Sequence, residues 1–62
     1  MKKINNQAMN IMNITFSDGT TETFKVDKKN SEVEEGFYLL RDENENIIVE
    51  INLNFIKIIR WD

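Results

Sequence analysis

Cysteine and histidine are both absent from this chain of 62 residues. Without cysteine it can form neither disulfides nor thiolate metal sites, and without histidine it lacks the commonest remaining zinc ligand. General acid–base catalysis near neutral pH would need a carboxylate or a lysine with a strongly shifted pKa. Serine lacks a histidine base, and two glycines cannot build a phosphate-binding loop. We therefore expect a protein that is not an enzyme and that binds no metal, no cofactor and no small-molecule substrate.

Long apolar runs are also missing. No stretch approaches the roughly 20 apolar residues of a membrane span. Met1-Lys2-Lys3 begins like a secretory signal, but the following residues 4–7 supply no apolar core. We expect a soluble, cytoplasmic protein without membrane contact. Residues 1–8 are predicted to be a flexible tail, and residues 9–62 a single small domain that buries only about 60% of its unfolded surface.

Positive charge is scarce. Eight lysines and arginines stand against eleven aspartates and glutamates, which gives a net charge of −3. Because phosphate neutralisation by basic residues dominates nucleic-acid binding, this balance argues against that function. It remains the alternative hypothesis, since small barrels often present aromatic side chains to bases. The candidates are the aromatic Tyr38, Phe55 and Trp61 with the basic Lys25, Lys57 and Arg60.

Alternating apolar residues predict a first hairpin. Residues 10–16 and 20–27 each place apolar side chains on one face, and Asp18-Gly19 lies between them. A two-residue loop would pair apolar with polar positions. An odd-length loop instead pairs Met12 with Phe24, or pairs Ile14 with Phe24 if the register shifts by one step. We favour a three-residue loop, 17–19, with Gly19 in the left-handed conformation.

The polar segment 28–36 follows. Ser31 and Glu34 have the spacing of a helix capping box, and Gly36 can end a turn. This pattern predicts one short helical turn near residues 31–35, or a structured loop. Carboxylates here could hold a cation only weakly, since their spacing does not match a calcium loop.

A second hairpin is predicted from segments 37–42 and 47–53 around a polar four-residue loop. This register pairs Leu40 with Val49 and Tyr38 with Ile51, which makes one apolar face. The same register places Phe37, Leu39 and Ile48 on the opposite face. Two apolar faces are more than so small a chain can bury in its own core.

The C-terminal segment spaces three apolar residues by three, as expected if a 3₁₀ turn separates two strands. These residues are Leu53, Ile56 and Ile59. Residues 49–59, Val-Glu-Ile-Asn-Leu-Asn-Phe-Ile-Lys-Ile-Ile, are similar to the last two strands of SH3-like barrels. The two hairpins and this C-terminal strand thus resemble an all-β, five-stranded antiparallel SH3-like barrel. The resemblance covers about the last two-thirds of the chain, and no peptide-binding SH3 signature is present.

The surplus apolar face predicts a protein-interaction or assembly module, since contiguous exposed apolar patches usually mark interfaces. The expected partner is another protein, including a second copy of the chain. The opposing interpretation is that barrel curvature and the 28–36 loop cover this face. The Asn-, Ile- and Lys-rich composition resembles that of low-GC Gram-positive bacteria and their phages, which permits a phage or mobile-element accessory protein. The predicted interface residues are Phe37, Leu39, Ile48, Phe55 and Ile58.

Overall fold

The computed structural model describes residues 9–62, so the predicted flexible tail, residues 1–8, lies outside the described residues. Six strands and one 3₁₀ turn follow one another along the chain. They are β1 (Asn10–Phe16), β2 (Thr21–Val26), β3 (Glu32–Glu34), β4 (Phe37–Arg41), β5 (Ile47–Asn52), η1 (Leu53–Phe55) and β6 (Ile56–Trp61).

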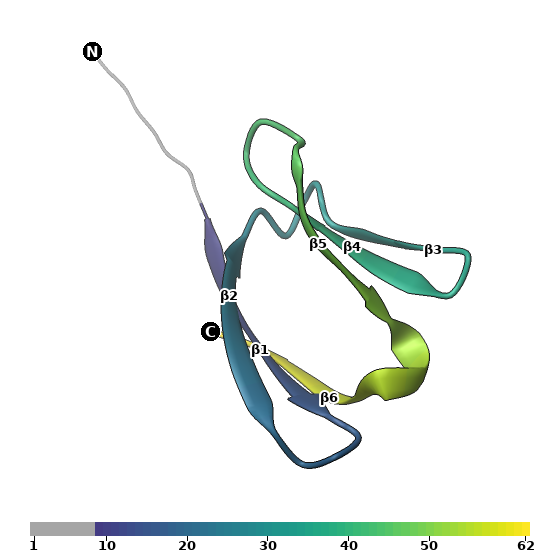
Figure 1. Cartoon of the computed structure of the whole chain (residues 1–62). Coiled ribbons are helices and arrows are strands. Elements are labelled where there is room, and N and C mark those ends of the chain that lie inside the picture. The colour runs from purple at the N-terminus through teal and green to yellow at the C-terminus, as the bar shows by residue number, and fades with distance from the viewer. Residues whose placement is uncertain (1–8) are drawn as a thin grey trace.

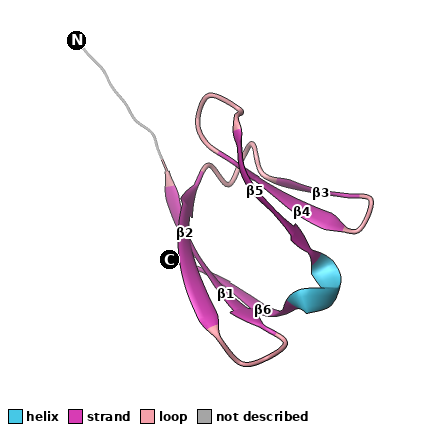
Figure 2. Ribbon diagram, in the orientation of Figure 1, coloured by secondary structure: helices cyan, strands magenta, loops and turns pink. Residues whose placement is uncertain are grey.

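The strands form two antiparallel sheets, with orders β2-β1-β6 and β3-β4-β5 (Figure 1). The prediction of an all-β domain is confirmed, because η1 is the one helical element of residues 9–62 (Figure 2). Between the described strands no ladder joins one sheet to the other, so they form no closed barrel. Nor does this part of the chain contain a helix long and apolar enough to cross a membrane.

The first hairpin has the predicted register. Met12 lies opposite Phe24, and the N–H of Phe16 donates to the carbonyl of Thr20 at 2.8 Å, which leaves a three-residue loop. Gly19 has a φ of 92°, a conformation that costs an L-residue free energy and that glycine adopts freely. The strand pairing and the conformation of Gly19 therefore both agree with the predicted three-residue loop.

The second hairpin also has the predicted register, with Tyr38 opposite Ile51 and Leu40 opposite Val49. A bulge follows Leu40. The loop closes on Asp42, whose Oδ1 accepts from the backbone N–H groups of residues 44 and 46 at 2.9 and 3.0 Å. A side chain that satisfies two loop donors in this way fixes the polar loop without apolar contacts.

The helical turn predicted near residues 31–35 is wrong. Glu32–Glu34 forms β3 instead, antiparallel to β4, which gives six strands where five were expected. The Ser31 hydroxyl does not cap a helix, because it donates to the carbonyl of Asp27 at 2.8 Å. Glu35 and Gly36 both have positive φ, 50° and 84°, as a tight two-residue hairpin turn requires.

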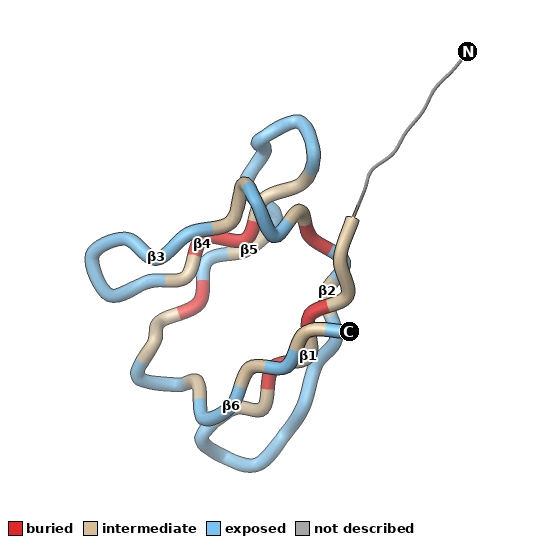
Figure 3. The backbone as a smooth tube through the Cα atoms, turned by 180° about the vertical axis from the view of Figure 1, so that it is seen from behind, coloured by how far each residue is buried: buried red, intermediate tan, exposed pale blue. Residues whose placement is uncertain are grey.

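The core lies between the inner faces of the two sheets. Its buried members are Met12, Ile14, Val26, Leu40 and Ile51. Partly buried residues pack around them: Phe16, Phe24, Tyr38, Val49, Ile56, Ile59 and Trp61. Buried segments accordingly appear in β1, β2, β4 and β5, so both sheets contribute (Figure 3). In β6, Ile59 and Trp61 pack against this core and Ile58 is exposed.

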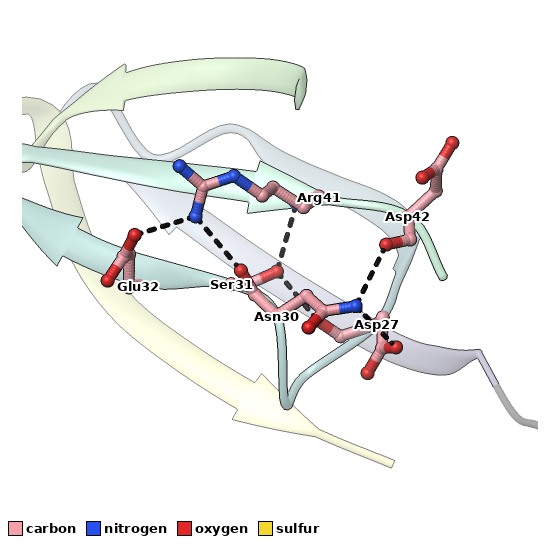
Figure 4. A network of polar contacts seen from close by, with 6 residues as sticks. All are labelled: Asp27, Asn30, Ser31, Glu32, Arg41 and Asp42. Carbon is pink, nitrogen blue, oxygen red and sulfur yellow. Dashed lines mark hydrogen bonds and ion pairs between the residues drawn. The ribbon is translucent and has the colours of Figure 1, made fainter. Parts of the chain in front are cut away.

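A polar network joins the two sheets where β2 leads into β3 (Figure 4). The backbone N–H of Asp27 donates to the carbonyl of Arg41 at 2.8 Å. The Asn30 amide donates to the Asp27 carboxylate at 3.1 Å, and the Arg41 guanidinium donates to the Asn30 carbonyl at 3.1 Å. Arg41 also forms an ion pair with Glu32 at 2.7 Å. These contacts hold the 27–31 turn against β4.

Candidate protein-binding surface

Four of the five predicted interface residues are exposed. Phe37, Ile48, Phe55 and Ile58 expose 39%, 47%, 61% and 42% of their surface. Leu39 differs, because only 9% of its surface is accessible although it lies outside the core cluster. Leu39 is therefore largely covered. For this residue the structure agrees with the opposing interpretation, in which the second apolar face is covered within the molecule.

Two of the exposed residues line one groove with Phe16. This phenylalanine groove, defined by Phe16, Phe37 and Phe55, has a volume of about 660 Å³. Its walls come from the β1–β2 hairpin, the start of β4, the end of β5 and η1. Side chains from three separate chain segments thus converge on one concavity, since β5 leads directly into η1.

Backbone hydrogen bonds fix the groove walls to one another. The N–H of Ser17 donates to the carbonyl of Phe55 at 2.7 Å, and the N–H of Leu53 donates to the carbonyl of Gly36 at 2.9 Å. The β1–β2 loop, the β3–β4 turn and η1 therefore lie at the same end of the molecule (Figure 1). The Asn52 side chain accepts from the N–H of Asn54 at 2.9 Å and caps η1. The exposed Phe55 accordingly stands on an anchored turn.

A second, shallower groove of about 390 Å³ adjoins the first. Phe37 and Glu50 line both grooves, and Leu39 lines only the second. The structure thus brings together Phe37, Leu39 and Phe55 of the predicted set. Ile48 lies near the β4–β5 bulge, and Ile58 pairs with Thr15 in the other sheet, so neither lines the two grooves.

Carboxylates line both grooves together with the apolar side chains. Asp18, Glu22 and Glu50 line the phenylalanine groove, and Glu34 and Glu35 line the adjoining one. No lysine or arginine lines either groove within residues 9–62. We call these five carboxylates the acidic rim of the two grooves.

Asp18 is held in its ionised form. The backbone N–H of Thr20 donates to its Oδ1 at 3.0 Å, and the Thr20 hydroxyl donates to the same atom at 2.7 Å. These bonds, the backbone one first, lower the pKa of Asp18 below its usual value. Asp18 thus contributes a negative charge to the groove at neutral pH.

Sequence reasoning missed the acidic rim and two further exposed apolar residues, Val33 and Ile47, at 55% and 47% exposure. The signal for Glu22 was present in the first hairpin. The register places Glu22 opposite Ile14, so both side chains lie on the same face of the sheet. Because Ile14 belongs to the core, an acidic residue opposite it was an unexpected feature of that face. Val33 gave no such signal, because it lies within the segment predicted to be helical.

The residues of the nucleic-acid alternative are not brought together. Tyr38 and Trp61 pack against the core, and burial raises the pKa of Tyr38. The ammonium of Lys28 lies 4.9 Å from the centre of the Trp61 ring. Phe55 instead lines the phenylalanine groove, together with carboxylates.

The basic residues of that alternative lie in β2 and β6, in the sheet that also contains Trp61. Lys25 pairs with Ile11 and Arg60 pairs with Asn13, while Lys57 falls at the β1–β6 irregularity. An aromatic platform flanked by cations is therefore not formed by these side chains.

Over residues 9–62, no group of three or more histidines, cysteines, aspartates or glutamates could hold a metal ion. The concave surface has apolar and anionic side chains, which suit contacts to a complementary macromolecular surface. A search of protein-family models, of characterised proteins and of solved structures finds no significant match to this chain.

Proposed function

We propose that this protein is a non-enzymatic protein-binding module whose contact surface is the phenylalanine groove. One observation carries the proposal: Phe37 and Phe55, exposed by 39% and 61%, line the same concavity. Single exposed apolar side chains are ordinary on protein surfaces, whereas apolar side chains gathered in a concavity characterise binding sites. Buried aromatic anchors also dominate the binding free energy of protein interfaces.

The rigidity of the groove supports this function. Ser17 bonds to two consecutive carbonyls of η1, through its N–H to that of Phe55 and through its hydroxyl to that of Asn54 at 3.1 Å. An aromatic side chain on an anchored backbone loses less conformational entropy on binding than one on a free loop. Phe55 is accordingly the best candidate for the central anchor.

The proposal includes a fold assignment. We regard the two sheets as an open form of a five-stranded SH3-like barrel, with β2 and β3 as two halves of one bent strand. The 27–31 turn interrupts this strand, and the Asp27 N–H already bonds to β4. η1 lies between β5 and β6, as the resemblance of residues 49–59 to the last two strands of such barrels predicts. This assignment leaves the phenylalanine groove at the open end of the barrel.

Site-specific photo-crosslinking tests the proposal. The substitution Phe55→p-benzoylphenylalanine, made in the cells that express the protein, should give a discrete adduct with a protein partner. The matched control is Val33→p-benzoylphenylalanine, an exposed apolar position outside both grooves. Equal labelling at both positions, or none at position 55, would contradict the proposal.

The proposal covers a second copy of the chain as well as a different protein. Sedimentation equilibrium of the purified protein over micromolar to millimolar concentrations distinguishes the two. An oligomer that dissociates on Phe55→Ala assigns the groove to self-assembly, and a monomer that still forms the crosslinked adduct in cells assigns it to a different protein.

A further inference from the structure

We propose that the phenylalanine groove accepts an extended segment of another protein in which lysines or arginines flank a bulky apolar side chain. This inference rests on the proposed function and adds the chemical class of the partner. Two features support it: the negative charge of the acidic rim and the backbone groups of β5 that face the free edge of its sheet.

The rim charge selects a basic partner. Five carboxylates line the two adjoining grooves, and no basic residue in the described part of the chain lines either. Arg41, in the neighbouring strand β4, is engaged by Glu32 at 2.7 Å. Charges arranged this way favour a partner of opposite sign and disfavour one of like sign. A second copy docked groove to groove would oppose the same carboxylates, which destabilises that arrangement.

The β5 edge selects an extended partner. Leu53 and Gly36 form a hydrogen-bonded pair, and antiparallel ladders alternate between bonded and non-bonded pairs. The backbone of Ile51 therefore points toward β4, and that of Glu50 points away from it. Since β5 is the outer strand of its sheet, the N–H and C=O of Glu50 face a free edge beside the groove. An added strand can pair with such an edge.

The groove is large enough for a side-chain anchor. Its volume of about 660 Å³ falls within the range of about 300–1,000 Å³ that is typical of ligand pockets. Phe16 and Ile51 lie at its floor beside the exposed Phe55, so an aromatic or aliphatic side chain entering the groove meets apolar atoms. Lysine or arginine residues on either side of that anchor then reach the carboxylates of the rim.

Fluorescence anisotropy with defined peptides tests the inference. The probe is a labelled peptide of sequence Lys-Lys-Leu-Phe-Leu-Lys-Lys, and its counterparts carry glutamine or glutamate in place of every lysine. We expect the lysine peptide to bind the full chain at least about tenfold more tightly than the glutamine peptide, and the glutamate peptide not to bind. Raising the salt concentration should weaken the binding of the lysine peptide.

Two groove variants and two controls locate the binding. Phe55→Ala and Glu50→Lys should each weaken binding of the lysine peptide by about tenfold or more. Val33→Ala truncates another exposed apolar side chain, and Glu43→Lys makes the same charge reversal as Glu50→Lys. Both positions are exposed and lie outside both grooves, so neither control should change the affinity. If Glu43→Lys weakens binding as much as Glu50→Lys, the attraction is only to net charge and the inference is overturned.

The remaining outcomes separate this inference from the proposed function. If the glutamine or glutamate peptide binds as tightly as the lysine peptide and loses affinity on Phe55→Ala, the groove binds peptides but the inferred charge class is wrong. If no peptide binds, both the inference and the choice of this groove are overturned. A further outcome is that the purified protein forms oligomers and that both Glu50→Lys and Lys57→Glu dissociate them. The groove would then be occupied by the basic β6 segment of a second copy, and the assignment to another protein would be overturned.

Discussion

The backbone N–H of Arg41 donates to the Oγ atom of Ser31 at 3.0 Å, across the bend that separates β2 from β3. The same hydroxyl donates to the Asp27 carbonyl at 2.8 Å, so one small side chain ties the end of β4 to the turn (Figure 4). Two sheets without a shared ladder depend on such contacts to keep their relative position. The network at this corner therefore also maintains the groove at the other end of the sheets.

Replacing Ser31 tests this dependence. Ser31→Ala removes both hydrogen bonds and leaves the Arg41 N–H without a partner in a half-buried position, which should lower the free energy of unfolding by about 1–3 kcal/mol. A chain of this length has a total stability of only about 3–9 kcal/mol, so the shift in a urea denaturation curve should be large. Ser17→Ala serves as the control.

Ser17 is an exposed serine whose hydroxyl makes one bond, to the Asn54 carbonyl, and whose backbone bond to Phe55 survives the substitution. We expect a loss of about 0.5–1.5 kcal/mol there. Equal losses for both variants would show that Ser31 has no special role at the corner.

Gly19 provides a test of backbone conformation alone. Its φ is 92°, and a Cβ added there would meet no atom within 4 Å, so Gly19→Ala changes strain without causing a clash. We expect a loss of about 1–2 kcal/mol of unfolding free energy, because L-residues resist the left-handed region. Gly19→D-Ala, introduced by chemical synthesis, should recover that loss, since a D-residue favours positive φ. A D-alanine variant as unstable as the L-alanine variant would mean that side-chain bulk, not φ, sets the cost.

Strand pairing could be predicted from the sequence where a short loop fixed the register. In both hairpins the structure has the register expected from the loop length. In the first hairpin, parity alone left two registers open, and the observed one sets Ile14 opposite Glu22. The capping-box pattern of Ser31 and Glu34 failed because serine serves turns as readily as helices. Here the Ser31 hydroxyl donates to the carbonyl of Asp27, which is near in sequence, and accepts from the N–H of Arg41, which the fold brings close to it.

The candidate site was predictable only in part. Phe37 and Phe55 were identified from the surplus of apolar residues, but their convergence with Phe16 depends on how the two sheets meet at one end, which strand patterns do not specify. Leu39 was placed with them by strand parity, yet its exposed fraction is 9%. Parity assigns a residue to a face of a sheet and does not reveal which neighbouring side chains cover it.

Leu39 and Phe55 should therefore respond differently to a buried charge. Leu39→Asp places a carboxylate in a nearly buried position without a cationic partner and should abolish the cooperative thermal unfolding transition monitored by circular dichroism. Phe55→Asp, at 61% exposure, should change the unfolding free energy by no more than about 0.5 kcal/mol while weakening binding of the lysine peptide by about tenfold or more. An unchanged melt for Leu39→Asp would place that side chain on the open surface beside Phe37 instead.

The two loop aspartates predict how stability depends on pH. The backbone N–H of Asn46, and after it that of Asn44, lowers the pKa of Asp42 below its ordinary 3.8, and Thr20 does the same for Asp18. A carboxyl with a lower pKa in the folded state stabilises that state above the unfolded value, and the contribution is lost as the pH falls through the folded pKa. Urea midpoints should therefore hold above about pH 4 and decline below it.

Asp42→Asn isolates one contribution to that decline. Asparagine keeps an oxygen acceptor for the loop N–H groups but cannot titrate, so the urea midpoint of this variant should fall less steeply below pH 3.8 than that of the native chain. Glu43→Gln removes an exposed carboxylate from the same loop and serves as the control for the loss of a negative charge. If the Asp42→Asn curve is parallel to the native one, the loop hydrogen bonds do not distinguish the ionised carboxylate from its protonated form.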